Sequence, residues 1–195
     1  MALTESLALV LPLAENIVAY HTPISREVFE ANYAIIAGTK AALFGKGIAF
    51  AADSGPRIAA LELREQARIK AAERGEFTPD GKPSETAATA LLAELKRLTM
   101  VLCGSDAGWE QVPVQFAMDR GAIDPEDWRE AESNLVFFTC AYAMASRRDK
   151  AKLARGTAGV MGASITSLPL PEFIASLPTS TATNPTSATP LSIPS

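Results

Sequence analysis

Few side chains in this sequence are of types that carry out catalysis. The single histidine is His21, and the two cysteines are Cys103 and Cys140. No residue pattern places a nucleophile beside His21, so we interpret it as a surface or helix-cap residue. The cysteines form no CxxC pair and lie in apolar surroundings, which favours two reduced core thiols, with a disulfide as the alternative. We therefore expect no enzymatic activity, no cofactor and no metal site.

Acidic residues gather at one predicted helix start. Opposed carboxylates can act as acid and base or bind a metal ion, but acids at a helix N-terminus already have a structural role in the field of the helix dipole. We assign that structural role to Asp124, Glu126, Asp127, Glu130 and Glu132.

Three glycines, Gly156, Gly159 and Gly162, are spaced by threes. A phosphate-binding loop would be followed by Lys and Ser or Thr, and this one is not. We expect a closely packed helix or a helix end instead.

A basic run follows the most apolar segment of the chain. Cations at a helix C-terminus stabilise the dipole, but this run is denser than capping requires. A docking patch for an acidic partner is the other interpretation. The run consists of Arg147, Arg148, Lys150, Lys152 and Arg155.

Charge and hydropathy restrict the other classes of function. The net charge is −4 and the pI is about 5.1, which does not suit a general nucleic-acid binder, and no basic recognition helix is evident. The apolar stretch 7–13 has no basic residue before it, so it does not resemble a secretory signal. The uncharged stretch 133–146 is shorter than the roughly 20 residues that span a bilayer. We expect a soluble cytoplasmic protein that binds neither nucleic acid nor membrane.

The elements that position these groups are expected to be mainly α. Apolar spacing and capping residues predict helices over 22–45, 54–74, 84–102, 113–120, 124–146, 149–161 and 171–177. Residues 1–21 are ambiguous, with 7–13 and 16–20 as candidate strands. The prediction is one domain over 1–177, with about five to seven helices and room for a short N-terminal β element. A disordered Pro/Ser/Thr-rich tail or linker is expected over 178–195.

Within this domain, Leu135–Phe138 lies in a segment that is apolar nearly all round, which predicts the central core helix. The charged, glycine- and proline-rich segment 75–84 predicts an exposed, mobile hinge.

Several segments of the ordered part together resemble one family. They are Tyr20–Phe29, Gly55–Leu61, Leu91–Thr99, Asp127–Glu132 leading into Phe137–Thr139, and Ser164–Leu168. In these segments, which extend over most of 1–177, the chain resembles the tail assembly chaperones of long-tailed bacteriophages with non-contractile tails. The resemblance implies an assembly factor in the host cell cytoplasm. It would bind the tape-measure protein, keep it soluble, and help tail tube subunits to polymerise around it.

The same family is often made in two lengths by a programmed frameshift, and the predicted tail would suit a linker to such an extension. The oligomeric state stays open, with a homo-oligomer as one possibility. The alternative function is a virion structural protein, either a head–tail connector or a minor tail component.

A chaperone for a long helical client needs apolar anchors at helical spacing. The candidates are Phe173, Ile174 and Leu177 on the last short helix, with Arg147, Arg148 and Lys150 steering the partner.

Overall fold

The computed structural model describes residues 7–178, and the first of these residues form strands. β1 (Ala8–Ala14) and β2 (Ile17–His21) pair as an antiparallel hairpin. β5 (Ser164–Thr166) pairs with β1 on its other side, but only as far as Val10. Pro12 lies beyond that point, where one side of the strand needs no backbone donor. Both candidate strands of the ambiguous N-terminal segment are therefore confirmed within residues 8–21, where they form a hairpin inside a sheet.

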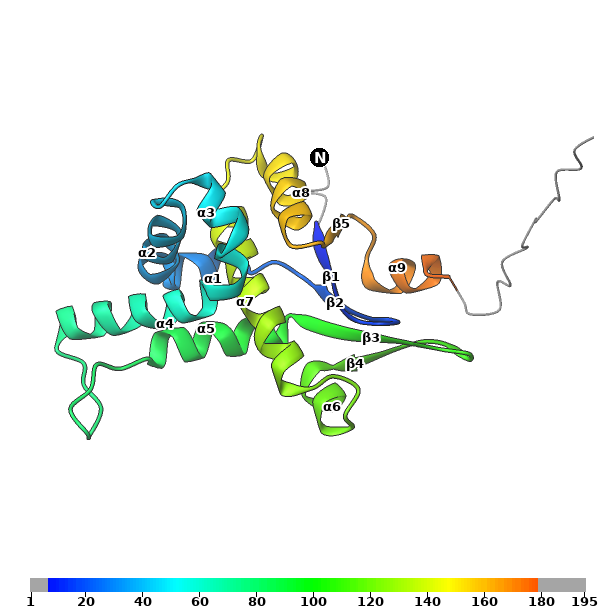
Figure 1. The fold of residues 1–195 in the computed structure, drawn as a ribbon, viewed down its shortest axis with the longest axis horizontal. Helices are drawn as coiled ribbons and strands as arrows, with labels where there is room; N and C mark the ends of the chain where they lie inside the picture. The colour runs from blue at the N-terminus through cyan, green and yellow to red at the C-terminus, as the bar shows by residue number, and fades with distance from the viewer. Residues whose placement is uncertain (1–6, 179–195) are drawn as a thin grey trace, which may run out of the picture.

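β3 (Thr99–Ser105) and β4 (Gly108–Pro113) form a second hairpin that widens the sheet. Across residues 7–178 the strand order is β4-β3-β2-β1-β5, and every neighbouring pair is antiparallel (Figure 1). The mainly α fold predicted from the sequence is therefore wrong. The protein has an α/β fold, and residues 7–178 are 57% helical and 17% strand.

The sequence predicts a helix where the second hairpin begins, because leucines there recur at helical spacing. The stripe of Leu91, Leu95 and Leu98 continues to Leu102, which predicts one long helix, yet α5 (Thr86–Arg97) ends before β3. The residues from Thr99 to Cys103 are suited to a strand and pair with β2 along its whole length. Tertiary pairing therefore overrides the helical spacing at this point.

Nine helices occur within residues 7–178, against the five to seven predicted. The predicted helix 22–45 is divided at Asn32 into α1 (Arg26–Ala31) and α2 (Tyr33–Phe44), and α3 (Ile48–Asp53) was not predicted. Five predicted helices are confirmed within a few residues: α4 (Gly55–Arg74), α6 (Val114–Asp119), α7 (Pro125–Tyr142), α8 (Lys150–Val160) and α9 (Leu170–Ser176). In the described part of the chain, no helix has both the length and the apolar character needed to cross a membrane.

Helix α7 is the central core helix that the sequence predicts. Asp124 caps it, because its Oδ1 accepts hydrogen bonds from the backbone N–H groups of Glu126 and Asp127 at 2.7 and 2.8 Å. The Asp127 side chain accepts in return from the Asp124 N–H, which completes a capping box. The second half of α7 is buried from Ser133 to Ala141, and Phe138 is fully buried.

The sheet has two apolar faces, because side chains alternate along each strand. The inner-face residues, such as Leu9, Ala19 and Val101, join the main core under α4, α5 and α7. Ala8, Val10, Tyr20 and Leu102 point to the outer face and form a second, smaller cluster. Figure 1 shows the main group of helices on one side of the sheet and α9 on the other.

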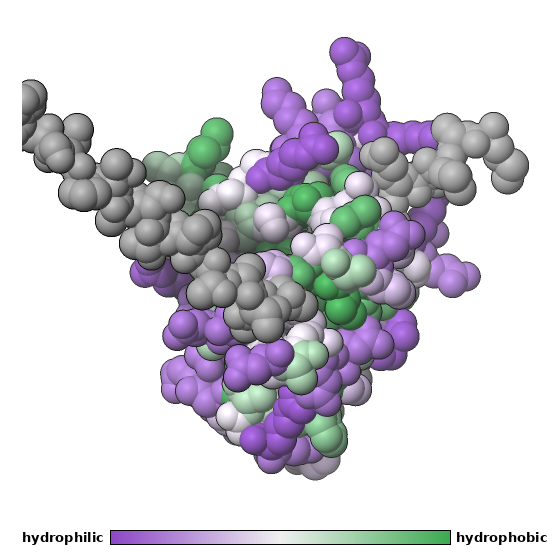
Figure 2. All heavy atoms as spheres, turned by 90° about the vertical axis from the view of Figure 1, so that its right-hand side faces the viewer, coloured by the Kyte–Doolittle hydropathy of each residue, from purple (hydrophilic) through white to green (hydrophobic). Residues whose placement is uncertain are grey.

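Helix α9 covers the middle of the outer face. Its Phe173 ring lies 5.6 Å from the Tyr20 ring, and the Tyr20 hydroxyl donates a hydrogen bond to Leu168 O at 2.9 Å. Trp109 Nε1 donates to Pro178 O at 2.9 Å. Figure 2 faces this side of the molecule and shows hydrophobic residues near its centre with hydrophilic residues around them. Of the tail predicted over 178–195, all but Pro178 lies outside the described residues.

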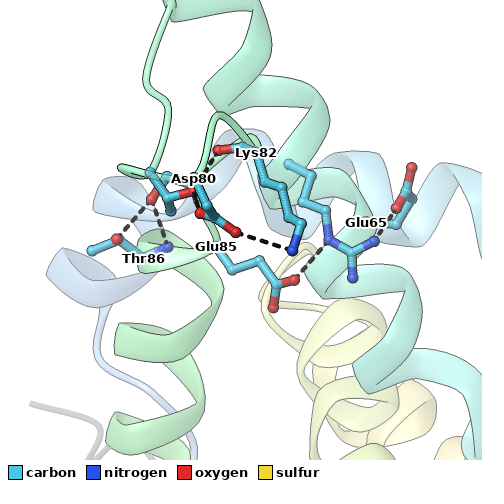
Figure 3. Close-up of polar contacts among 8 residues, drawn as sticks. Glu65, Asp80, Lys82, Glu85 and Thr86 are labelled. Atoms are coloured by element: carbon cyan, nitrogen blue, oxygen red, sulfur yellow. Dashed lines mark hydrogen bonds and ion pairs between the residues drawn. The ribbon is translucent and has the colours of Figure 1, made fainter.

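The predicted hinge 75–84 is an exposed turn that polar contacts hold closed (Figure 3). Arg68 of α4 donates to Glu65 at 2.9 Å and to Glu85 at 2.7 Å, and Lys82 Nζ lies 3.0 Å from an Asp80 oxygen. Exposed ion pairs of this kind contribute little stability one by one. Of these pairs, only Arg68–Glu85 links α4 to the start of α5.

His21 is not a surface or cap residue, contrary to the sequence interpretation, because it is fully buried at the end of β2. Its Nδ1 lies 2.9 Å from Thr99 Oγ1, and the Thr99 hydroxyl donates its hydrogen to Leu95 O. Thr99 must therefore accept from His21 Nδ1–H, and Nε2 is left as a buried acceptor without a partner among the described residues. Burial lowers the pKa of His21 to about 3, so the folded protein keeps this ring neutral at pH 7.

We predict that acid destabilises the fold through His21. The unfolded chain binds a proton on this ring below about pH 6.5, whereas the folded chain does not until about pH 3, so stability is lost as the pH falls through this window. At about pH 5 the loss from His21 alone is about 2 kcal/mol. Urea denaturation near neutral pH and near pH 5 measures it, with His21→Gln as the control. The variant should lose about 2 kcal/mol less than the natural chain; equal losses would show that the fold accommodates a protonated His21.

Candidate functional site

An apolar groove of about 450 Å³ lies between α8 on one side and α2 and α3 on the other. Phe137 and Ala141 of α7, both nearly buried, form its floor. The Phe44 ring at the end of α2 stacks on Phe137, with ring centroids 5.5 Å apart and an interplanar angle of 16°. Helices α2 and α8 both pack against α7, and the space between them is the groove.

Three large apolar side chains on the groove walls remain exposed to solvent. The exposed fraction is 83% for Ile48 of α3, and 42% and 44% for Leu153 and Val160 of α8. Single exposed apolar residues are ordinary on protein surfaces, whereas a group that converges on one hollow is typical of a binding surface. The groove is therefore the described surface best suited to receive apolar side chains from another molecule.

Helix α8 also presents a glycine to this groove. A Cβ added at Gly156 would meet no atom within 4 Å, and the same holds for Gly159, which does not line the groove. The closely packed helix expected from the glycine series is therefore wrong at these two positions. Gly162 does lie at the helix end, with a φ of +64°.

Cations line the groove, and no acidic residue does. Lys40 of α2 and Lys152 of α8 lie on its two walls. In residues 7–178, neither lysine forms an ion pair, and neither do the other members of the basic run. The surface around α8 is therefore positive and free to attract acidic groups.

The helix-capping interpretation of the basic run does not hold. Helix α7 ends at Tyr142 and has no basic residue in its last turn. Lys150 and Lys152 instead belong to the first turn of α8, where the helix dipole disfavours cations. This placement leaves the docking interpretation as the better account of the run.

The predicted basic site residues lie at the α7–α8 connection. Arg147 and Lys150 line a second hollow of about 510 Å³ together with Phe29 and Tyr142. Lys150 Nζ lies 4.7 Å from the centre of the Tyr142 ring, a cation–π distance. Arg148 is exposed in the connecting segment.

The predicted apolar anchors lie on a different surface. Phe173, Ile174 and Leu177 pack against the outer face of the sheet and are partly exposed. The structure therefore brings Arg147 and Lys150 together but does not bring the α9 residues into the same hollow. As anchors for a client, the α9 residues stay a prediction.

The two cysteines differ in burial, because Cys140 lies in the core whereas Cys103 is only partly buried. Cys103 and Cys140 are free thiols, which confirms the reduced state predicted for them. Burial raises the pKa of Cys140 to about 12, so this thiol is protonated at pH 7, with Sγ 3.7 Å from Ile36 O. Among residues 7–178, no group of three or more His, Cys, Asp or Glu side chains is placed to hold a metal ion. The groove can therefore bury apolar side chains of a partner next to positive charge.

We predict that Gly156→Ala stabilises the fold. A glycine in a helix interior costs about 1 kcal/mol relative to alanine, and the added methyl group meets nothing here. Gly162→Ala is the opposite case, because its left-handed backbone disfavours a Cβ by roughly 1–2 kcal/mol. Urea denaturation should therefore give a higher free energy of unfolding for Gly156→Ala and a lower one for Gly162→Ala. Destabilisation by Gly156→Ala would show that the space beside α8 is occupied.

Comparisons of the chain with profiles of protein families, with curated proteins and with solved structures gave no match.

Proposed function

We propose that this protein is an assembly chaperone of the phage-tail type that binds the tape-measure protein and keeps it soluble until the tail tube forms around it. The proposal places the protein in the host cell cytoplasm during assembly. It draws on the segment resemblance to tail assembly chaperones. The observation that carries it is the apolar groove over Phe137, in which Ile48, Leu153 and Val160 stay exposed.

A groove of this kind suits a client that must be held and then released. Each apolar side chain of leucine size that becomes buried contributes about 1.5–3 kcal/mol, and the entropy lost on association offsets much of the sum. A few such contacts therefore give moderate affinity. Release can then follow when tube subunits compete for the client, and no covalent step is needed.

The first test is co-expression with the tape-measure protein of the same genome, followed by size-exclusion chromatography. We expect the tape-measure protein to become soluble and to co-elute with this chain, because its apolar segments are covered. Expression of the tape-measure protein alone is the control and should give insoluble material. An insoluble client together with a separately eluting chain would contradict the proposal.

The second test separates the chaperone from a virion structural protein. We expect mass spectrometry of purified particles to detect the tail tube protein in quantity and this chain only in trace amounts. A stoichiometric amount in the particles would replace the chaperone with a connector or minor tail component.

A further inference from the structure

The groove has a shape that favours one type of occupant. Its floor is the side of a helix, α7, and its walls are helices that run on either side of that floor. Such a trough accepts a helix whose anchors recur every three or four residues, since these anchors fall on one side. Ile48 on one wall, and Leu153 and Val160 on the other, are positioned to close over them.

Gly156 allows this occupant to approach α8 closely. It lines the groove, is part of the α8 interior, and has no neighbour within 4 Å of the position that a Cβ would take. Nothing within the described chain explains a glycine here, although glycine disfavours the helix. A partner backbone can fit where a side chain would otherwise stand, as in close helix pairs with small residues at the contact.

The positive charge around the groove favours acidic residues on the occupant. Lys40 on the α2 wall and Lys152 on the α8 wall lie on opposite sides of the floor, and no acid lines the groove. Neither lysine forms an ion pair within residues 7–178. A helix with carboxylates on both sides of its apolar stripe would place one row near each lysine.

We infer that the groove binds an amphipathic helix with acidic residues on both sides of its apolar stripe, seated against α8 at Gly156. The inference rests on the proposed function in that such a helix would be a segment of the client. It goes further by fixing the chemistry of that segment and the surface that receives it.

Two synthetic peptides test the charge. Both are helices of about 18 residues with the same leucine stripe; one carries Glu on both flanks and the other carries Lys. We expect fluorescence anisotropy to show the Glu peptide binding at least about tenfold more tightly, with the difference shrinking as salt is raised. Lys40→Glu combined with Lys152→Glu should reverse the preference. Equal binding of the two peptides, or no binding of either, would overturn the inference.

Two matched variants test the location. Gly156→Leu places a side chain in the groove, whereas Gly159→Leu adds the same side chain to the same helix outside it, and neither meets a neighbouring atom at Cβ. We expect Gly156→Leu to weaken binding of the Glu peptide by at least about tenfold and Gly159→Leu by less than about twofold. Circular dichroism should show both variants folded. Equal effects of the two variants would place the peptide elsewhere.

The same variants separate this inference from the proposed function. If Gly156→Leu keeps the tape-measure protein soluble as well as the natural chain does, the client binds elsewhere and the inference fails while the chaperone stands. If the Glu peptide binds in the groove but the tape-measure protein stays insoluble, the groove assignment holds and the chaperone proposal fails.

Discussion

Burial of the second half of α7 is the constraint on which the rest of the structure depends. This segment is apolar on nearly every side, so it must be surrounded, and α2, α4, α5, α8 and the inner face of the sheet supply the surroundings. The first half begins at the Asp124 capping box and keeps charged residues such as Glu126 and Glu130 exposed, although Trp128 and Ala131 in it are already buried. The candidate groove is the stretch over Phe137 and Ala141 that α2 and α8 border without closing.

The sequence predicts α7 well because its signals are local. Asp124 followed by Pro125 marks a helix start, and the later apolar run requires burial whatever surrounds it. The hairpin β3–β4 is not predicted from the sequence, because its signals are not local. Leu98 and Leu102 fit a helical stripe, and only pairing with Val18 of β2, more than eighty positions earlier in the chain, makes Leu102 a strand residue. The burial of His21 is likewise invisible in its sequence neighbours, because it follows from the pairing of β2 with β3, which places Thr99 opposite it.

The residues of the candidate site likewise differ in whether local sequence signals predict them. The density of the basic run is visible in the sequence, and the structure adds that Lys150 and Lys152 stand at a helix start, where no dipole explains them. Ile48 could not be found from its neighbours, since an isoleucine between a glycine turn and an alanine-rich segment predicts burial as readily as exposure. The glycine at position 156 indicates missing bulk on a helix, but only the fold shows that no other part of the described chain fills the space.

The two apolar surfaces outside the main core differ in one respect that bears on function. The outer face of the sheet is covered by the chain's own α9, whose Phe173 packs on Tyr20, so Val10 and Leu102 are already out of water. The groove over α7 has no such cover from the described chain, and its walls keep Ile48 and Val160 exposed. Exposed apolar area is unfavourable in water, so a partner that covers this groove gains free energy from the burial. Lysines border the uncovered surface. A partner with both apolar and acidic side chains therefore gains binding free energy from apolar burial and from charge complementarity.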